Sequence, residues 1–273
     1  VMQKRLFNFK NVPVRIDKEL DDELWQDAND THAWSDDEGA SVWTTSMALY
    51  ALLKTGFVNQ CSEAERLELI ESVNWLCNQS DDSEDKESCW GYQKFRESKD
   101  CDPSMPMTAL ALRTLGEVCK CSDDLYNKGS DKCRRRANNP ERKFFKGRRY
   151  ALKQMKETED HIYWEYNSKP SIAATVWMIE ALEYPKHDTE FTVERHQELK
   201  EKAKNWILAQ LPDFGTTVDW PSEEFFSYSN SKYKKARNGK KTFYFLCRIQ
   251  FLHCLKWVLV RITRKSSHVS VGS

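Results

Sequence analysis

The side chains best suited to bind an anion gather in the middle of the chain. Residues 132–149, KCRRRANNPERKFFKGRR, carry nine basic side chains against a single acid, Glu141, and include Phe144 and Phe145. Basic side chains contact phosphate groups and aromatic rings stack on bases, so the segment predicts a site for nucleic acid or for a diphosphate-bearing ligand. The alternative is that these charges are solvated or pair with an acidic segment near the N-terminus. The candidate binding residues are Arg134, Arg135, Arg136, Arg142, Lys143, Arg148 and Arg149.

Charge is segregated along the chain, although the totals balance. The sequence has 42 basic and 42 acidic side chains, so no overall field favours nucleic acid or a membrane. Residues 16–38 hold ten acids, whereas residues 231–241, SKYKKARNGKK, add six basic side chains. The balanced total therefore hides local acidic and basic segments.

Cysteines supply a candidate zinc site. Cys119 and Cys121, with Cys133 and His161 further along, offer the thiolate and imidazole ligands that zinc prefers. The second matching pair of a zinc motif is absent, and the alternative is that these are ordinary thiols. The nine cysteines are odd in number and lack a regular framework spacing. We therefore expect reduced thiols in a cytoplasmic protein.

Three copies of one cassette organise the chain. The copies hold Trp34, Ser41, Thr45 and Leu49; Trp90, Ser104, Thr108 and Leu112; and Trp164, Ser171, Thr175 and Ile179. The spacing from Ser to Thr and from Thr to the following Leu or Ile is the same in all three copies, which predicts a repeat protein. Each Ser suits the start of a helix, because its hydroxyl accepts a hydrogen bond from an N–H of the first turn. The tryptophans either line a cavity for an apolar or stacking ligand or fill the corner between paired helices.

A second pattern, aromatic-xxx-Gln, precedes three of the Trp loops. It occurs at Trp75–Gln79, Tyr150–Gln154 and Trp206–Gln210, ten or eleven residues before the next Trp. Apolar residues at a spacing of three predict a helix over 65–79. One unit is therefore a helix ending at Gln, a loop with Trp, and a second helix opening at Ser. In a fourth unit, residues 243–260 predict an amphipathic packed helix and not a membrane span.

The alternating cassettes resemble the repeat of the terpenoid cyclases and protein prenyltransferases, whose fold is an α/α toroid that thioester-containing complement-type domains share. The resemblance covers roughly residues 20–262. It implies a double ring of helices, with the Ser/Thr cassettes in the inner ring and the Gln helices in the outer ring. The chain offers four inner helices and three or four outer ones, fewer than the closed barrel of the family. We therefore expect an incomplete or truncated toroid.

The residues that carry the family's chemistry are missing from the matching positions. Class II cyclases have an Asp-x-Asp-Asp run before the cassette Thr, and prenyltransferases place a zinc-binding Asp and Cys there. The windows before Thr45, Thr108 and Thr175 hold neither Asp nor Cys. The complement-type thioester needs a Cys followed by Gly, which does not occur in the sequence. Asp100 and Asp102 remain as candidate displaced acids, the alternative being an exposed acidic loop over 81–102.

These observations predict an all-α toroid of helix-pair repeats over 20–262, with basic insertions at 116–149 and 221–241. Residues 1–19 are expected to be an N-terminal extension and 263–273 a C-terminal tail. The chain begins with Val and has no apolar leader, so we expect a fragment or a processed product.

Three functions follow from the sequence. The first is a non-catalytic binding or sensor module of a larger intracellular protein, needing no cofactor, for a polyanion or a protein partner. The candidate ligand-binding side chains also include Trp34, Trp90 and Trp164. The second is an isoprenoid-processing enzyme with non-standard acidic residues. The third is a structural interaction scaffold. A repeat fold supports all three, because the same residues are needed for stacking whether or not chemistry occurs.

Overall fold

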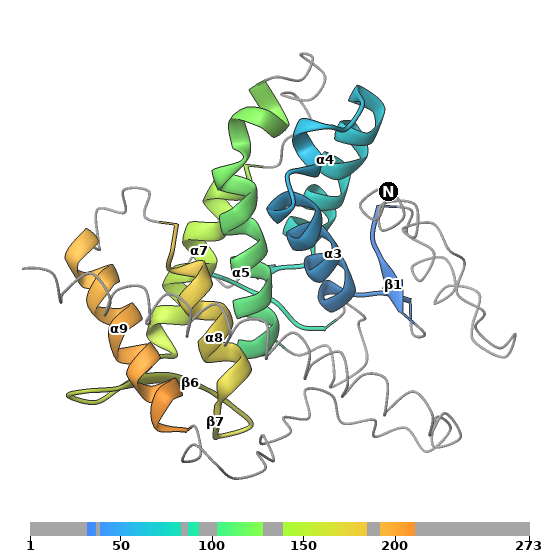
Figure 1. Ribbon diagram of the computed structural model, residues 1–273. Coiled ribbons are helices and arrows are strands. Elements are labelled where there is room, and N and C mark those ends of the chain that lie inside the picture. The colour runs from blue at the N-terminus through green and yellow to red at the C-terminus, as the bar shows by residue number, and fades with distance from the viewer. Residues whose placement is uncertain are drawn as a thin grey trace, which may run out of the picture. The chain divides into compact units, whose positions relative to one another are not determined.

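The computed structural model describes most of the N-terminal three quarters of the chain (Figure 1). The described ranges are residues 32–36, 39–82, 87–92, 103–127, 139–184 and 192–210. All of them belong to a compact unit of residues 1–213. This part is mostly helical, with short antiparallel strands between helices. The expected helix over 243–260 and the fourth cassette lie outside the described residues.

The cassette serines begin helices, as the sequence predicts. Ser41, Ser104 and Ser171 are N-cap residues, and each side chain accepts a hydrogen bond from the backbone N–H three residues later. Each cap satisfies one of the N–H groups that the first turn leaves unpaired. The helices that they begin are α3 (Val42–Lys54), α5 (Met105–Lys120) and α8 (Ile172–Ala181).

The aromatic-xxx-Gln segments end helices, which confirms the second pattern. Gln79, Gln154 and Gln210 are the C-cap residues. The helices that they end are α4 (Glu63–Asn78), α7 (Pro140–Lys153) and α9 (Val193–Ala209). Helix α4 begins with a reciprocal capping box between Ser62 and Glu65. A 3₁₀ turn (η2, Phe57–Asn59) and a π turn (η4, Asp123–Asn127) complete the helical elements of the described residues.

The Trp loops contain short strands, which an all-α interpretation did not predict. The strands are β1 (Ser35–Asp36), β2 (Gly39–Ala40), β3 (Asp81–Asp82), β4 (Ser88–Cys89), β5 (Lys156–Glu157), β6 (Ile162–Tyr166) and β7 (Lys169–Ser171). They pair antiparallel as β1–β2, β3–β4 and β5–β6–β7. Asn167 and Ser168, between β6 and β7, both have positive φ angles, as a tight two-residue hairpin requires. The strands lie in the connections that precede α3, α5 and α8, where the chain reverses direction.

One hydrogen bond recurs in all three cassettes. The backbone N–H of the Trp donates to the hydroxyl of the cassette Thr. The N–Oγ1 distances are 3.1 Å for Trp34–Thr45, 3.0 Å for Trp90–Thr108 and 3.2 Å for Trp164–Thr175. The three threonines are 0% exposed. The hydroxyl therefore satisfies a buried backbone donor where the hairpin meets the second helix of the pair.

The indoles make a second repeated contact, with the preceding helix. Trp90 Nε1 donates to the carbonyl of Leu76 at 2.8 Å, and Trp164 Nε1 donates to that of Ala151 at 2.6 Å. Both carbonyls lie two residues before the last residue of their helix, where the helix offers no N–H partner of its own. The same Trp therefore joins the end of one helix to the start of the next.

The helices form two layers around α5. Helix α5 packs between α3 and α8 in one layer and contacts α7 in the other, while α4 packs on α3 and α9 on α8 (Figure 1). Every residue of α5 from Met105 to Cys119 is buried, as expected for a helix covered on all sides. Arg113 of α5 lies 2.9 Å from the carboxylate of Glu180 and 3.6 Å over the Tyr50 ring, so it ties α5 to both neighbours.

None of the helices in the described part of the chain combines the length and the apolar character needed to cross a bilayer.

The cassette hydrogen bond predicts a stability difference between two buried threonines of α5. Thr108→Val leaves the Trp90 N–H unpaired and should lower the free energy of unfolding by about 1–3 kcal/mol. Thr114 is also 0% exposed, but its hydroxyl only donates, to the Ser46 and Leu110 carbonyls. Thr114→Val is the matched control and should cost about 1 kcal/mol or less. Urea denaturation followed by circular dichroism measures both; an equal cost would contradict the role given to the Thr108 hydroxyl.

Candidate functional site

The second half of the basic segment is a helix and not a loop. Asn139 caps α7, its side-chain oxygen accepting from the Arg142 N–H at 3.0 Å, and Pro140 occupies the first turn. The sequence predicts a basic insertion over residues 116–149. Residues 116–120 complete α5, and residues 140–149 form most of α7. The helix forms because it has a buried face as well as a charged one.

The buried face of α7 approaches α5 closely. A Cβ on Gly147 would lie 2.6 Å from Cζ3 of Trp90 and 2.8 Å from a methyl carbon of Leu112. Phe144 is 0% exposed, and its ring meets that of Tyr184 edge-on at 5.3 Å. The glycine and the phenylalanine therefore fix the position of α7 against the core.

Arg148, one of the predicted ligand-binding residues, belongs to the interior. It is 0% exposed, and its guanidinium donates to the Tyr184 carbonyl at 3.3 Å. The guanidinium carbon lies 5.3 Å from the ring centre of Phe144 and 4.8 Å from that of Phe145. A side chain held in this way stabilises the packing of α7 and does not reach a ligand at the surface.

Lys143, a second predicted binding residue, points to another part of the protein. Its Nζ lies 2.7 Å from the hydroxyl of Ser80, just after α4. Lys143 therefore links α7 to the end of the neighbouring helix.

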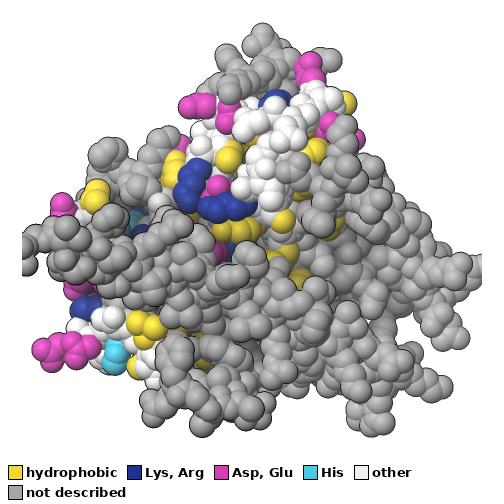
Figure 2. Space-filling view, viewed as in Figure 1, with side chains coloured by type: hydrophobic (Ala, Val, Ile, Leu, Met, Phe, Trp, Pro, Cys, Tyr) yellow, Lys and Arg dark blue, Asp and Glu magenta, His cyan; other side chains and the backbone are white. Residues whose placement is uncertain are grey.

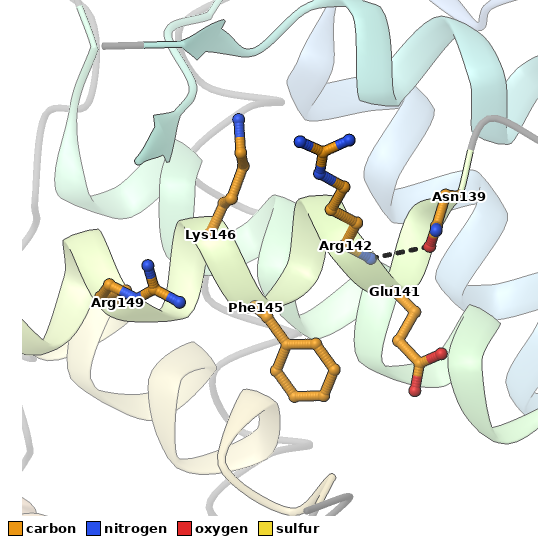
Figure 3. A pocket seen from close by; sticks show the side chains of 6 residues that line it. All are labelled: Asn139, Glu141, Arg142, Phe145, Lys146 and Arg149. Carbon is orange, nitrogen blue, oxygen red and sulfur yellow. Dashed lines mark hydrogen bonds between the residues drawn. The ribbon is translucent and has the colours of Figure 1, made fainter. Parts of the chain in front are cut away.

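Three other basic side chains of α7, Arg142, Lys146 and Arg149, line a hollow of about 410 Å³ (Figure 3). Its lining residues are Asn139, Glu141, Arg142, Phe145, Lys146 and Arg149. The three cations recur at i, i+4 and i+7, so they follow one side of the helix over about 10 Å. In Figure 3, Arg142 and Lys146 extend to the same side of α7, whereas Phe145 and Glu141 extend to the other.

The carboxylate in the hollow is already engaged by the protein. The Tyr184 hydroxyl lies 3.4 Å from Oε1 of Glu141. Burial raises the pKa of Tyr184 well above its ordinary value, and Cys119 and Glu141 add to the effect. The hydroxyl therefore stays protonated and donates to Glu141. Three cations and one acid give the lining a net positive charge.

This positive charge is local. Figure 2 shows acidic, basic and apolar side chains interspersed over the described part of the face that it presents. The hollow on α7 is therefore where the structure brings predicted binding residues together, namely Arg142 and Arg149. Arg134, Arg135 and Arg136 lie outside the described residues.

Lys146 is the residue that sequence analysis missed. The signal was available in the pair Asn139-Pro140, which marks a helix start. Once the segment is taken as a helix, the spacing from Arg142 to Lys146 and Arg149 puts the three cations on one side.

The tryptophans are interior residues. Trp34 is 4% exposed, and Trp90 and Trp164 are 0% exposed. The burial and the indole hydrogen bonds agree with the second of the two interpretations, in which the tryptophans fill the corner between paired helices. They do not agree with tryptophans that line a ligand cavity.

The cysteine candidates do not converge on a metal site in the described ranges. Cys119 is buried beside Tyr184, whereas Cys121 is half-buried at the end of α5. No three His, Cys, Asp or Glu side chains among the described residues are arranged to hold a metal ion. Cys133, Asp100 and Asp102 lie outside these ranges.

No protein-family model matches the sequence, and no curated protein matches it either. The geometry of α7 is therefore the basis for a functional assignment.

The close approach of α7 predicts that Gly147→Ala is destabilising. The new methyl group overlaps Trp90 and Leu112, so the free energy of unfolding should fall by about 1–3 kcal/mol, although alanine favours a helix by about 1 kcal/mol. Gly116→Ala is the matched control, because its Cβ would come no closer than 3.3 Å to the Phe144 ring and 3.6 Å to Cβ of Tyr184. Thermal unfolding compares the two; a Gly147→Ala protein as stable as the wild type would contradict the packing described.

Proposed function

We propose that the protein is a non-catalytic module that binds a phosphate-bearing polyanion on α7. The observation that carries the proposal is the set of three cations, Arg142, Lys146 and Arg149, around a hollow that also exposes part of Phe145. Arginine forms paired hydrogen bonds with phosphate oxygens, and lysine adds a mobile point charge. The local excess of positive charge favours a ligand with several negative charges.

The rigid placement of α7 supports the proposal. The helix is fixed by Gly147, Phe144 and the buried Arg148, so its outward side chains start from defined positions. A ligand that binds pre-positioned groups loses less free energy to ordering than one that must order a loop. A packed helix is therefore a better base for this site than an irregular insertion.

The non-catalytic part of the proposal rests on the cassette windows. They hold no carboxylate or cysteine, and their polar side chains serve the fold. Thr44, for example, donates its hydroxyl to the Trp34 carbonyl at 2.6 Å. We infer that the helix layers are part of an incomplete α/α toroid; the placing of α3, α5 and α8 in one layer supports this.

The salt dependence of binding tests the proposal. A labelled oligonucleotide should bind with an affinity that falls steeply with salt concentration. Arg142→Gln, Lys146→Gln and Arg149→Gln should each lower the slope of log affinity against log salt by about 0.7.

Lys143→Gln is the matched control, because it removes the same charge from the same helix at a position outside the hollow. It should leave both the affinity and the slope close to the wild-type values. If Lys143→Gln weakens binding as much as Arg142→Gln, or if no salt-dependent binding occurs, the proposed function is wrong.

A further inference from the structure

We infer that the polyanion is a single-stranded nucleic acid and that one of its bases stacks on Phe145. The inference rests on the proposed function and names its ligand class. Two adjacent phenylalanines occur in α7, and the structure gives them different roles. Phe144 is 0% exposed, whereas Phe145 is only partly covered and lines the hollow.

The Phe145 ring is held in place from the protein side. Its centre lies 5.6 Å from that of Phe144, at an interplanar angle of 70°. The guanidinium carbon of Arg148 lies 4.8 Å from the Phe145 ring centre, and Arg148 is fully buried. The cation therefore approaches the ring from the interior. A ring fixed by two contacts loses little conformational freedom when a base stacks on it.

Arg142 and Lys146 extend to the opposite side of α7 from the Phe145 ring but line the same hollow, so they can contact the backbone of a strand whose base stacks on the ring. Arg142 lies one turn before Phe145, Arg149 lies one turn after it, and Lys146 is its neighbour. This order, cation, ring, cation, combines a charged track for phosphates with a stacking platform. The track extends about 10 Å along the helix, which suits a few nucleotides of an extended strand.

The partly exposed Phe145 ring distinguishes a single strand from other polyanions. In a duplex the faces of the bases are covered by their neighbours, and exposing one requires unstacking. Heparin carries the negative charge but has no aromatic face. A site that binds through charge alone would bind the single strand, the duplex and heparin, whereas stacking on the Phe145 ring favours the single strand.

The test measures the affinity of a single-stranded oligonucleotide, its duplex and heparin for the wild type, Phe145→Leu, Phe145→Tyr and Phe145→Trp. Phe145→Leu keeps an apolar side chain and removes the ring, and it should weaken single-strand binding about ten-fold. Heparin affinity and the salt slope should stay at their wild-type values. Phe145→Tyr keeps the ring and should retain single-strand binding. Phe145→Trp enlarges the ring and should tighten it, which provides a gain in affinity that a loss of folding cannot imitate.

The outcomes separate this inference from the proposed function. The inference is wrong and the proposed function stands if all three polyanions bind with equal affinity, if Arg142→Gln weakens their binding, and if the Phe145 variants leave it unchanged. If Phe145→Leu weakens heparin and single-strand binding by the same factor, stacking is also excluded. If no polyanion binds in an Arg142-dependent way, both are wrong.

Discussion

The hydrogen bond from the backbone N–H of a cassette Trp to the hydroxyl of a cassette Thr is the constraint on which the rest of the structure depends. It fixes the hairpin to the start of the following helix, while the indole of the same Trp holds the end of the preceding helix. The spacing of Trp and Thr therefore determines where two helices meet. Two cassette tryptophans fix the position of helix α7. Gly147 packs on Trp90, and the Trp164 indole donates to the Ala151 carbonyl near the C-terminal end of the helix.

The division of one helix between core and surface gives the site its properties. Phe144, Gly147 and Arg148 face the interior, and the side chains that line the hollow are thereby held outward. Arg148 has a double effect, because it anchors α7 through the Tyr184 carbonyl and supports the Phe145 ring from behind. A protein with balanced charge can in this way present a locally cationic surface without an overall field.

The sequence predicts the repeated elements well and the site only in part. Capping is a local interaction, so Ser104 and Gln154 mark helix ends whatever surrounds them. The secondary structure of the basic segment, residues 132–149, depends instead on long-range packing. The pair Asn139-Pro140 marks a helix start, but the low apolar content of the segment hides the buried face, which forms through the contact of Gly147 with Trp90, far away in sequence. For the same reason the burial of Arg148 could not be predicted, since charged residues are seldom fully buried.

The most direct measurement is photocrosslinking of the protein to a single-stranded oligonucleotide that carries a photoreactive base, followed by mass spectrometry of the digested protein. Stacking on Phe145 places the reactive base against α7, so adducts are expected on peptides from residues 140–153. Excess heparin should suppress the adducts, because it competes for Arg142, Lys146 and Arg149. Adducts confined to other segments of the chain, with residues 140–153 unmodified, would contradict the assignment of α7 as the binding surface.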